Sequence, residues 1–292
     1  MTSPDHVELA DGRRIDCYVS GPEGGLPLVF HHGTPGARPP ARAIERAAHA
    51  RGLRFVTYSR PGYGDSTPLS GRSVADAVSD TRELLEAIGA SRCVVAGWSG
   101  GGPHALACAA RLEASAAALV IAGVAPYGVE GLDWSAGMGE DNVVEFEAAL
   151  AGEATLRGLL EDIRSHLAEV TVEGIITSLA SLLPEVDRAV LTDEFGEDVA
   201  EGFHEALRVG IEGWVEDDLC FVSPWGFELE EIKTPVAIWQ GSLDLMVPFA
   251  HGKWLASAVP GAVAHLEEGE GHLSVGIGSI GKMLDELVAA AG

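Results

Sequence analysis

The 292-residue chain has few basic residues, with 19 Lys+Arg against 44 Asp+Glu and a formal net charge of −25. A surface this acidic repels phosphate backbones and anionic lipid headgroups, which disfavours nucleic-acid and membrane-surface roles. The sequence also lacks any apolar run approaching the ~18 residues of a membrane span. Its first twenty residues contain no apolar segment of the signal-peptide type. We therefore expect a cytoplasmic protein that acts on a small-molecule substrate, either as a monomer or as a homodimer.

Cysteine is scarce too, and the four cysteines are far apart with no Cys-x-x-Cys pair. This spacing argues against a zinc knuckle, a redox dithiol or a disulfide-rich scaffold. Reduced, buried thiols are the remaining interpretation. Neither a metal nor an organic cofactor is expected. Hydrophobic residues make up 47% of the chain, which is enough to bury a globular core. The cysteines are Cys17, Cys93, Cys108 and Cys220.

The order of apolar segments predicts an α/β fold. Two short alternating runs, 6–10 and 13–20, flank Asp11-Gly12 and predict a hairpin. Later apolar runs do not alternate, which is typical of parallel strands covered by helices on both faces. Helical patterns separate them, so we expect a doubly wound, mostly parallel sheet. The expected strands are 28–30, 55–58, 93–96, 118–121, 236–240 and 262–266, and the expected helices are 38–51, 73–88, 103–112, 249–259 and 273–291.

This alternation stops near Pro126 and resumes near Thr234. Residues 126–232 contain no convincing strand pattern, and 156–170, 172–183 and 199–215 are expected to be helices. This segment holds 26 Asp+Glu and 4 Arg, so it carries −22 of the net charge. We expect a core formed by 1–125 and 233–292, with 126–232 inserted as an all-helical lid.

The most specific motif is Gly97-Trp98-Ser99-Gly100-Gly101, which directly follows an expected strand and directly precedes an expected helix. This is the G-x-S-x-G nucleophile elbow in its diagnostic context. The chain must reverse within one residue, which forces Ser99 into strained dihedrals. Side chains at Gly97 and Gly101 would collide across the turn, and Trp98 supports the elbow. The helix N-terminus beneath Ser99 favours a developing anion.

A second motif, His31-His32-Gly33-Thr34-Pro35-Gly36, follows the strand at 28–30. The loop after this strand lies beside the elbow in such sheets, and its backbone can donate to an oxyanion. We assign the oxyanion hole to the backbone N–H groups of Thr34 and Gly100. His32 and Gly33 are expected to shape the loop. Adjacent side chains of an extended segment point in opposite directions, so the two histidines are not expected to share a metal.

A serine hydroxyl is a weak nucleophile unless a base accepts its proton and a carboxylate orients that base. Asp244 follows the expected strand 236–240, and His272 follows the strand 262–266 and opens the last helix. The order Ser99, Asp244, His272 is that of one fold class and differs from both serine-protease orders. His104 is five residues past Ser99 on the elbow helix and is expected to be a buried core residue.

Together these motifs resemble the α/β-hydrolase superfamily, over residues 6–125 and 233–290. The loop Ser59-Arg60-Pro61-Gly62-Tyr63-Gly64-Asp65-Ser66 is similar to an Asp-x-Pro-Gly-x-Gly-x-Ser loop of many members, with Ser59 in place of Asp. The resemblance implies an eight-stranded, mostly parallel sheet with a helical cap. Some members draw the acid from after the sixth strand, but here residues 122–125 contain no carboxylate, so Asp244 keeps the role.

The reaction expected from this resemblance is hydrolysis of a small neutral or cationic carboxylic ester through an acyl-serine intermediate. A serine at the elbow argues against the dehalogenases and epoxide hydrolases of the fold, which use Asp. Four alternatives stay open: a proline-iminopeptidase-like activity, carbon–carbon bond hydrolysis, a perhydrolase, and a non-catalytic ligand-binding protein. Tryptophans in 126–232 are expected either to line an acyl pocket or to pack within the lid; they are Trp134, Trp214 and Trp225.

Overall fold

The computed structural model describes residues 5–191 and 193–292. Its sheet has eight strands in the order β1-β2-β4-β3-β5-β6-β7-β8. The first two strands run antiparallel to their neighbours, and the remaining pairs are parallel. This confirms the predicted mostly parallel sheet. The strands are β1 (His6–Glu8), β2 (Arg14–Ser20), β3 (Pro27–His31), β4 (Arg54–Tyr58), β5 (Cys93–Trp98), β6 (Ser115–Ile121), β7 (Val236–Gly241) and β8 (Val263–Glu267).

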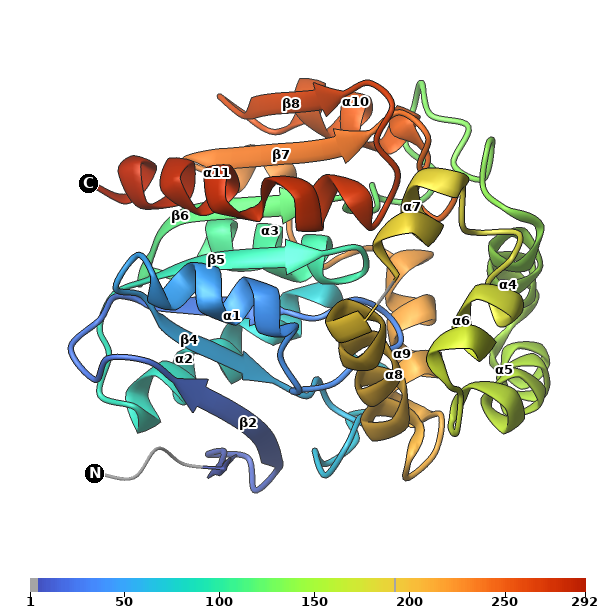
Figure 1. The fold of residues 1–292 in the computed structure, drawn as a ribbon. Helices are drawn as coiled ribbons and strands as arrows, with labels where there is room; N and C mark the ends of the chain where they lie inside the picture. The colour runs from blue at the N-terminus through green and yellow to red at the C-terminus, as the bar shows by residue number, and fades with distance from the viewer. Residues whose placement is uncertain (1–4, 192) are drawn as a thin grey trace.

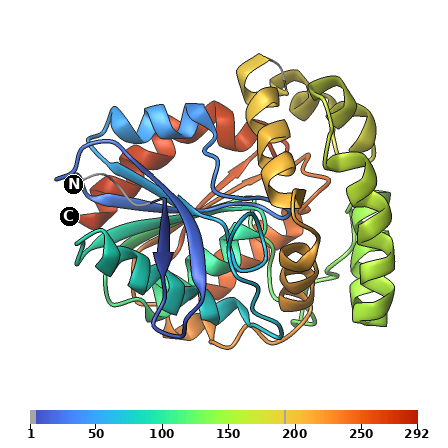
Figure 2. The same ribbon diagram turned by 90° about the horizontal axis from the view of Figure 1, so that it is seen from below.

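Helices cover both faces of the sheet, and Figure 2 shows the sheet between these two layers. Successive residues of a strand point to opposite faces. In β3, Leu28 and Phe30 therefore join the apolar core on one face, while Val29 joins the core on the other. Strands that are apolar on both faces thus explain the absence of alternation in the sequence. The first layer contains α1 (Arg42–His49) and α11 (Ser274–Ala291), and the second contains η1 (Val74–Asp76), α2 (Ala77–Ala87), α3 (Gly101–Arg111) and α10 (Phe249–Ala258).

Two helices of the core differ from their predicted extents. The helix expected from residue 38 begins only at Arg42, because prolines occupy positions 39 and 40 and restrict the residues before them. The helix expected from Ser73 begins with a 3₁₀ turn, in which the Asp76 carboxylate accepts from the Ser73 backbone N–H at 2.6 Å. The predicted hairpin is confirmed, and Gly12 has a φ of 85° in its turn.

Between β6 and β7 the described residues of 126–232 form helices and no strand. Figure 1 shows these helices beyond the carboxyl ends of the parallel strands. The single helix predicted over 199–215 is wrong, because one helix ends at Leu207 and the next begins at Glu212. Between them, Gly210 has a φ of 154°. Helices α4 and α7 were not predicted. The helices are α4 (Glu140–Ala151), α5 (Glu153–Leu167), α6 (Val172–Ser178), α7 (Glu185–Val190), α8 (Asp193–Leu207), α9 (Glu212–Phe221) and η2 (Leu229–Glu231).

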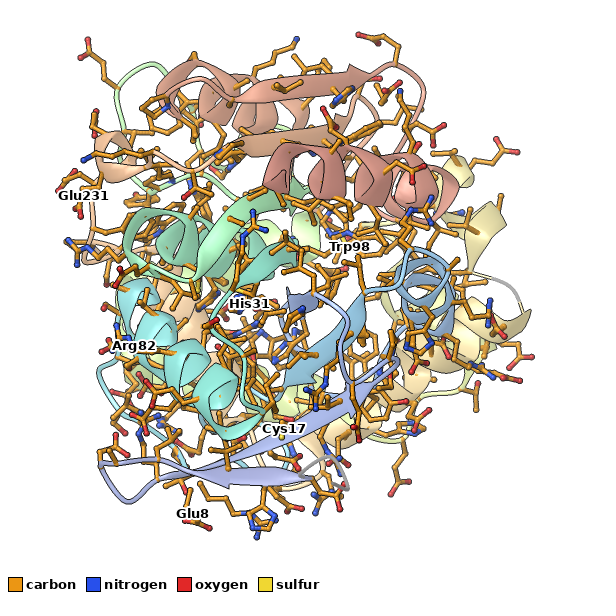
Figure 3. The ribbon with its side chains drawn as sticks, turned by 90° about the vertical axis from the view of Figure 1, so that its left-hand side faces the viewer. Glu8, Cys17, His31, Arg82, Trp98 and Glu231 are labelled. Carbon is orange, nitrogen blue, oxygen red and sulfur yellow. The ribbon has the colours of Figure 1, made fainter. Side chains whose placement is uncertain are left out.

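The last residues of β3 and β5 lie inside the molecule. Figure 3 shows His31 and Trp98 near its middle, whereas Glu8, Arg82 and Glu231 lie toward its periphery. His31 is 1% exposed and Trp98 is 8% exposed. The two loops that leave these strands therefore begin in the core and lead to the carboxyl edge of the sheet.

Candidate active site

Ser99 lies at the sharp turn between β5 and α3 and has a φ of 56°, a left-handed value that is uncommon outside glycine. Every residue from Cys93 to Ala109 is buried except Ser99, which is partly exposed. A Cβ atom on Gly97 would lie 2.1 Å from the carbonyl oxygen of Gly101. A Cβ atom on Gly101 would lie 2.1 Å from the carbonyl oxygen of His31. The strained turn thus presents one hydroxyl, as the sequence predicted.

His272 and Asp244 are bonded side chain to side chain. The Nδ1 atom of His272 lies 2.8 Å from Oδ2 of Asp244. An ionised carboxylate only accepts, so Nδ1 carries the proton and Nε2 is left as an acceptor. Asp244 is itself held by the backbone N–H groups of Met246 and Val247, each at 2.8 Å, and by the Gln240 side-chain amide at 2.8 Å. Both members of the pair are buried.

The environment of His272 favours its protonated form. Burial alone would lower the pKa of His272, but the charge and hydrogen bond of Asp244, and then the charge of Asp187, raise it above its usual value. Asp187 belongs to α7, and its carboxylate accepts from the His272 backbone N–H at 2.8 Å. Trp98 donates from its indole Nε1–H to the His272 carbonyl oxygen at 3.2 Å.

Thr34 and Gly100, the residues assigned to the oxyanion hole, lie next to each other. A Cβ atom on Gly100 would lie 2.4 Å from Oγ1 of Thr34 and 2.8 Å from the Phe221 ring. Within residues 5–191 and 193–292, the backbone N–H groups of Thr34 and Gly100 donate to no protein acceptor. These two amides therefore remain the predicted donors of the oxyanion hole.

A buried ionic cluster, which the sequence does not predict, contacts the loop that contains Thr34. Asp217 of α9 is paired with Arg60 and Arg72, at 2.5 Å and 2.6 Å, and all three side chains are at most 3% exposed. Asp217 also accepts from Oγ1 of Thr34 at 2.7 Å and from the Tyr63 hydroxyl at 2.9 Å. Burial alone would raise the pKa of Asp217, but the two arginine charges hold it well below its usual range.

Arg60 extends this cluster to the backbone of the loop. Its guanidinium donates to the carbonyl oxygens of His32 and Gly33, at 2.6 Å and 2.9 Å. The His32 ring lies 2.7 Å from the Gly33 oxygen through Nδ1, and its Nε2 accepts from the Arg60 backbone N–H at 3.1 Å. His32 therefore shapes the loop, as expected. Ser59, in the place of the family's Asp, accepts from the Arg38 backbone N–H at 3.1 Å and so contributes to loop packing.

The other histidines singled out from the sequence are buried. His104 is 1% exposed and its Nδ1 lies 2.9 Å from the Gly100 carbonyl oxygen, so it is a core residue, as predicted. His31 packs against His104 and Tyr58. Burial lowers the pKa of His31 to about 3, which leaves this imidazole neutral.

A cavity of about 700 Å³ brings the predicted site residues together, since Ser99, His272, Thr34, Gly100 and His32 all line it. Most of its wall is apolar or aromatic. No lysine or arginine is among its lining residues, all of which belong to the described chain. Its five acidic lining residues are Glu140, Asp141, Glu145, Asp198 and Asp218.

Two of these acids, Glu145 and Asp218, interact with each other. Burial raises the pKa of Glu145, while burial and the Glu145 charge raise the pKa of Asp218 well above its usual range. Both carboxyl groups therefore hold a proton more tightly than exposed acids do. Trp214 donates to Glu145 at 2.8 Å and lines the cavity. Trp134 and Trp225 are buried outside the cavity wall.

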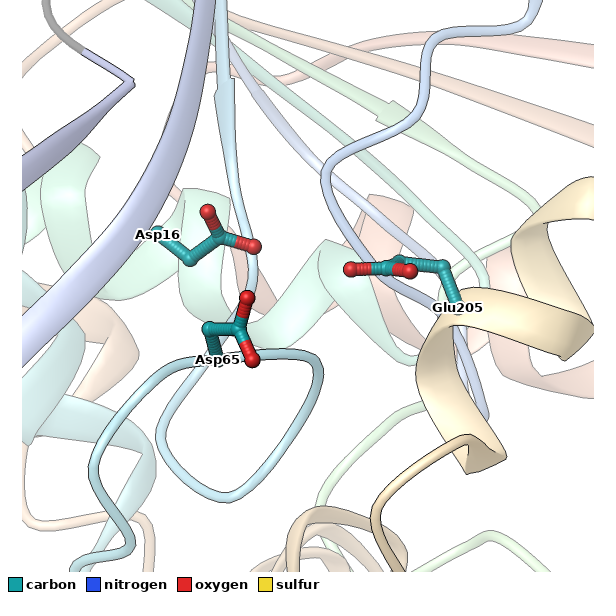
Figure 4. A group of neighbouring side chains, drawn as sticks. All are labelled: Asp16, Asp65 and Glu205. Atoms are coloured by element: carbon teal, nitrogen blue, oxygen red, sulfur yellow. The ribbon is translucent and has the colours of Figure 1, made fainter.

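One cluster of carboxylates away from the cavity has the ligand type that hard cations prefer. Figure 4 shows Asp16, Asp65 and Glu205 pointing toward one another. Arg38 lies 2.8 Å from Asp16, and Arg208 lies 2.9 Å from Asp65 and 3.2 Å from Glu205. Each of the three carboxylates is therefore within ion-pair distance of one of two guanidinium groups, and the cluster is a set of ion pairs between β2, the 59–66 loop and α8.

The chain belongs to the α/β-hydrolase family, whose model, described as alpha/beta hydrolase fold, matches residues 27–277. It is 32% identical to a non-heme chloroperoxidase of Streptomyces lividans, over 84% of this chain and 83% of that protein. It is 29% identical to a pimeloyl-[acyl-carrier protein] methyl ester esterase of Aromatoleum aromaticum, over 72% and 77% of the two chains. An esterase from Exiguobacterium antarcticum has the same fold, with a TM-score of 0.66, 17% identity and 98% coverage of both chains.

None of the helices in the described part of the chain has the length and hydropathy needed to cross a bilayer.

Proposed function

We propose that the protein is a serine hydrolase that cleaves a small neutral or cationic carboxylic ester through an acyl-serine intermediate. The observation that carries this proposal is the convergence of Ser99 and His272 on one cavity, with His272 bonded to Asp244 at 2.8 Å. The esterase names among its relatives support an ester as the substrate. Asp244, His272 and Ser99 then act as orienting acid, general base and nucleophile.

In the acylation step, the Ser99 hydroxyl gives its proton to Nε2 of His272 as its oxygen bonds to the ester carbonyl carbon. The carbonyl oxygen becomes an oxyanion, which accepts from the backbone N–H groups of Thr34 and Gly100. The intermediate collapses and breaks the bond to the alcohol oxygen. That leaving alcohol takes the proton from His272, which leaves an acyl-Ser99 and a neutral imidazole.

Deacylation repeats these steps with water as the nucleophile. His272 accepts a proton from water while the water oxygen bonds to the acyl carbon. Collapse of this second intermediate releases the carboxylic acid, and the Ser99 oxygen recovers its proton from His272. Asp244 keeps Nδ1 protonated throughout and stabilises the imidazolium that forms twice in each cycle.

We also propose that residues 126–232 act as the lid over this site and bias its substrate choice. Many of the cavity's lining residues come from this segment, including all five acids. A wall with acids and no lysine or arginine disfavours anionic substrates and accepts neutral or cationic ones.

A fluorophosphonate probe tests the proposed function. Wild-type protein is expected to be labelled, and both Ser99→Ala and heat-denatured wild type are expected to remain unlabelled. A panel of p-nitrophenyl esters of increasing chain length, with an amino-acid anilide and a thioester, then identifies the bond that is cleaved. If folded wild type resists the probe and turns over none of the panel, the ligand-binding alternative replaces the enzyme.

A further inference from the structure

Asp187, in the segment 126–232, contacts the backbone of His272 and has no part in the reaction steps proposed above. Asp187 of α7 is completely buried. Its Oδ2 accepts from the His272 N–H at 2.8 Å, and its Oδ1 accepts from the N–H groups of Leu273 and Ser274, each at 2.9 Å. The carboxylate therefore caps α11, whose N-terminus carries a partial positive charge.

The chain approaches this carboxylate too closely for any side chain at position 271. A Cβ atom on Gly271 would lie 2.4 Å from Oδ1 of Asp187. The Gly271 N–H in turn donates to Oγ of Ser274 at 2.8 Å. Glycine at 271 thus permits the contact, and the local hydrogen bond holds the loop in the shape that Asp187 binds.

His272 is consequently fixed at three separate atoms. Asp187 holds its backbone nitrogen, Trp98 holds its carbonyl oxygen at 3.2 Å, and Asp244 holds Nδ1 at 2.8 Å. The atom left for chemistry is Nε2. A misplacement of about 1 Å in such a group can cost a factor of about 10² in rate, so each of these contacts bears on catalysis.

The residue that caps α11 comes from a distant part of the chain, which is unusual for a helix cap. Helix N-termini are most often capped by a nearby Ser, Thr, Asp or Asn. Here the residue at the cap position of α11, Leu273, has no capping side chain, and the acceptor comes from a residue 85 positions away from His272. Leu182 and Leu191, on either side of α7, line the cavity. Residues 182–191 therefore contribute both to the cavity wall and to the contact with His272.

We propose that Asp187 is a positioning residue for His272, through which the lid segment sets the place of the general base. This proposal rests on the proposed function. Two carboxylates lie next to His272: Asp244, from the loop after β7, is bonded to the imidazole, and Asp187 of α7 is bonded to its backbone. Ser99 of the elbow lines the same cavity. Loss of the Asp187 charge releases the backbone of residues 272–274 and removes one of the negative charges that favour imidazolium.

The test compares Asp187→Asn with Glu216→Gln. Glu216 is the control, because this buried carboxylate of α9 also accepts from a backbone amide of another segment, that of the exposed Gly71 at 2.8 Å, but does not line the cavity. We expect Asp187→Asn to lower kcat about 10- to 100-fold with little change in KM, and to move the acid limb of kcat/KM to lower pH. Glu216→Gln is expected to leave both within about twofold.

A readout independent of turnover separates this proposal from the proposed function. The low-field proton NMR resonance of the His272 Nδ1–H, assigned with His272→Gln, reports the bond to Asp244. In Asp187→Asn this resonance is expected to broaden or shift, and amide exchange at residues 272–274 is expected to accelerate, with both unchanged in Glu216→Gln. If wild type has no hydrolase activity, the NMR comparison still decides the positioning role. An Asp187→Asn protein with wild-type resonance, exchange and pH profile overturns it, and so does an equal effect in Glu216→Gln.

Discussion

The indole Nε1–H of Trp98 donates to the backbone carbonyl oxygen of His272 across 3.2 Å. The residue before Ser99, the proposed nucleophile, therefore contacts the residue expected to activate it. Trp98 also stacks on Phe195 with an interplanar angle of 9°, and a Cβ atom on Gly276 would lie 2.5 Å from its ring. The Trp98 side chain therefore links the turn between β5 and α3 to the start of α11.

Replacement of Trp98 by Phe tests this link. The ring contacts are largely kept, but the His272 carbonyl oxygen loses its donor while it stays buried, which costs about 1–3 kcal/mol of stability. We expect a lower midpoint in urea unfolding and a fall in kcat that exceeds the change in KM. Trp225→Phe is the control, because this buried tryptophan does not line the cavity. Equal kinetics in the two variants would show that the indole hydrogen bond plays no part in activity.

Activity is expected to fall at low pH, with a midpoint above the ordinary histidine value of ~6.5. The carboxylates of Asp244 and Asp187 raise the pKa of His272 despite its burial. Protonated His272 cannot accept the Ser99 proton, so kcat/KM drops as the pH falls through this raised pKa. The profile is measured with an ester that does not titrate between pH 4 and 9. A midpoint below ~6.5 would contradict the balance of charges described for this imidazole.

Loss of the negative charge of Asp217 from the buried cluster under the Thr34 loop should destabilise the protein. Asp217→Asn leaves Arg60 and Arg72 without their buried counter-ion, which typically costs about 3–5 kcal/mol. Thr34 also loses a carboxylate acceptor, so surviving folded protein is expected to show a lower kcat. Denaturant unfolding monitored by circular dichroism measures the first effect. Arg157→Gln, which breaks partly exposed pairs with Glu153 and Glu212, is the control and is expected to cost at most ~1 kcal/mol per pair.

The elbow glycines are expected to resist substitution. In Gly101→Ala the new methyl group meets the His31 carbonyl oxygen at 2.1 Å, and relief of this overlap costs at least ~1–3 kcal/mol. Gly158→Ala in α5 is the matched control, since a Cβ atom there meets nothing within 4 Å. Alanine at that helical position should stabilise by roughly 0.5–1 kcal/mol. Thermal unfolding of the two variants should move in opposite directions, and a neutral Gly101→Ala would refute the close approach.

Substrate charge should matter at low ionic strength. A cationic ester is expected to have a higher kcat/KM than a matched anionic ester of the same size, because the lining residues in the described part of the chain include five acids and no lysine or arginine. The difference should shrink at high salt, where exposed charges are screened over ~3–8 Å. A neutral isostere serves as the reference for intrinsic reactivity. Preference for the anionic ester at low salt would refute the proposed role of the lid acids.

The elbow and the Asp244–His272 pair could be anticipated because each lies where a strand ends, and strand ends are well marked by glycine and by short apolar runs. The break between α8 and α9 could not, since apolar spacing continues through Val209, whereas Gly210 takes a φ of 154°. α4 begins amid acids and glycines that give a weak helical signal. Such short or weakly periodic helices depend on tertiary packing, which a single sequence does not contain.

Asp187 and Asp217 could not be distinguished beforehand from the other acids of an acidic segment. Their partners are far along the chain: His272 is 85 positions after Asp187, and Asp217 is 157 positions after Arg60. Only the fold brings these groups into contact. Arg60 alone gave a signal, because it lies in the loop that resembles a family motif.

The buried pairing of Asp217 with Arg60 also limits which segments of related proteins could replace residues 126–232 in a chimera. The arginine belongs to the loop after β4, whereas its counter-ion comes from α9. A chimera that received residues 126–232 from a relative without an equivalent acid would bury two unpaired guanidinium groups beneath Thr34. Exchange of residues 126–232 therefore requires a donor segment with an acid at the position of Asp217. Without that acid, the chimera is destabilised before any new substrate preference can be transferred.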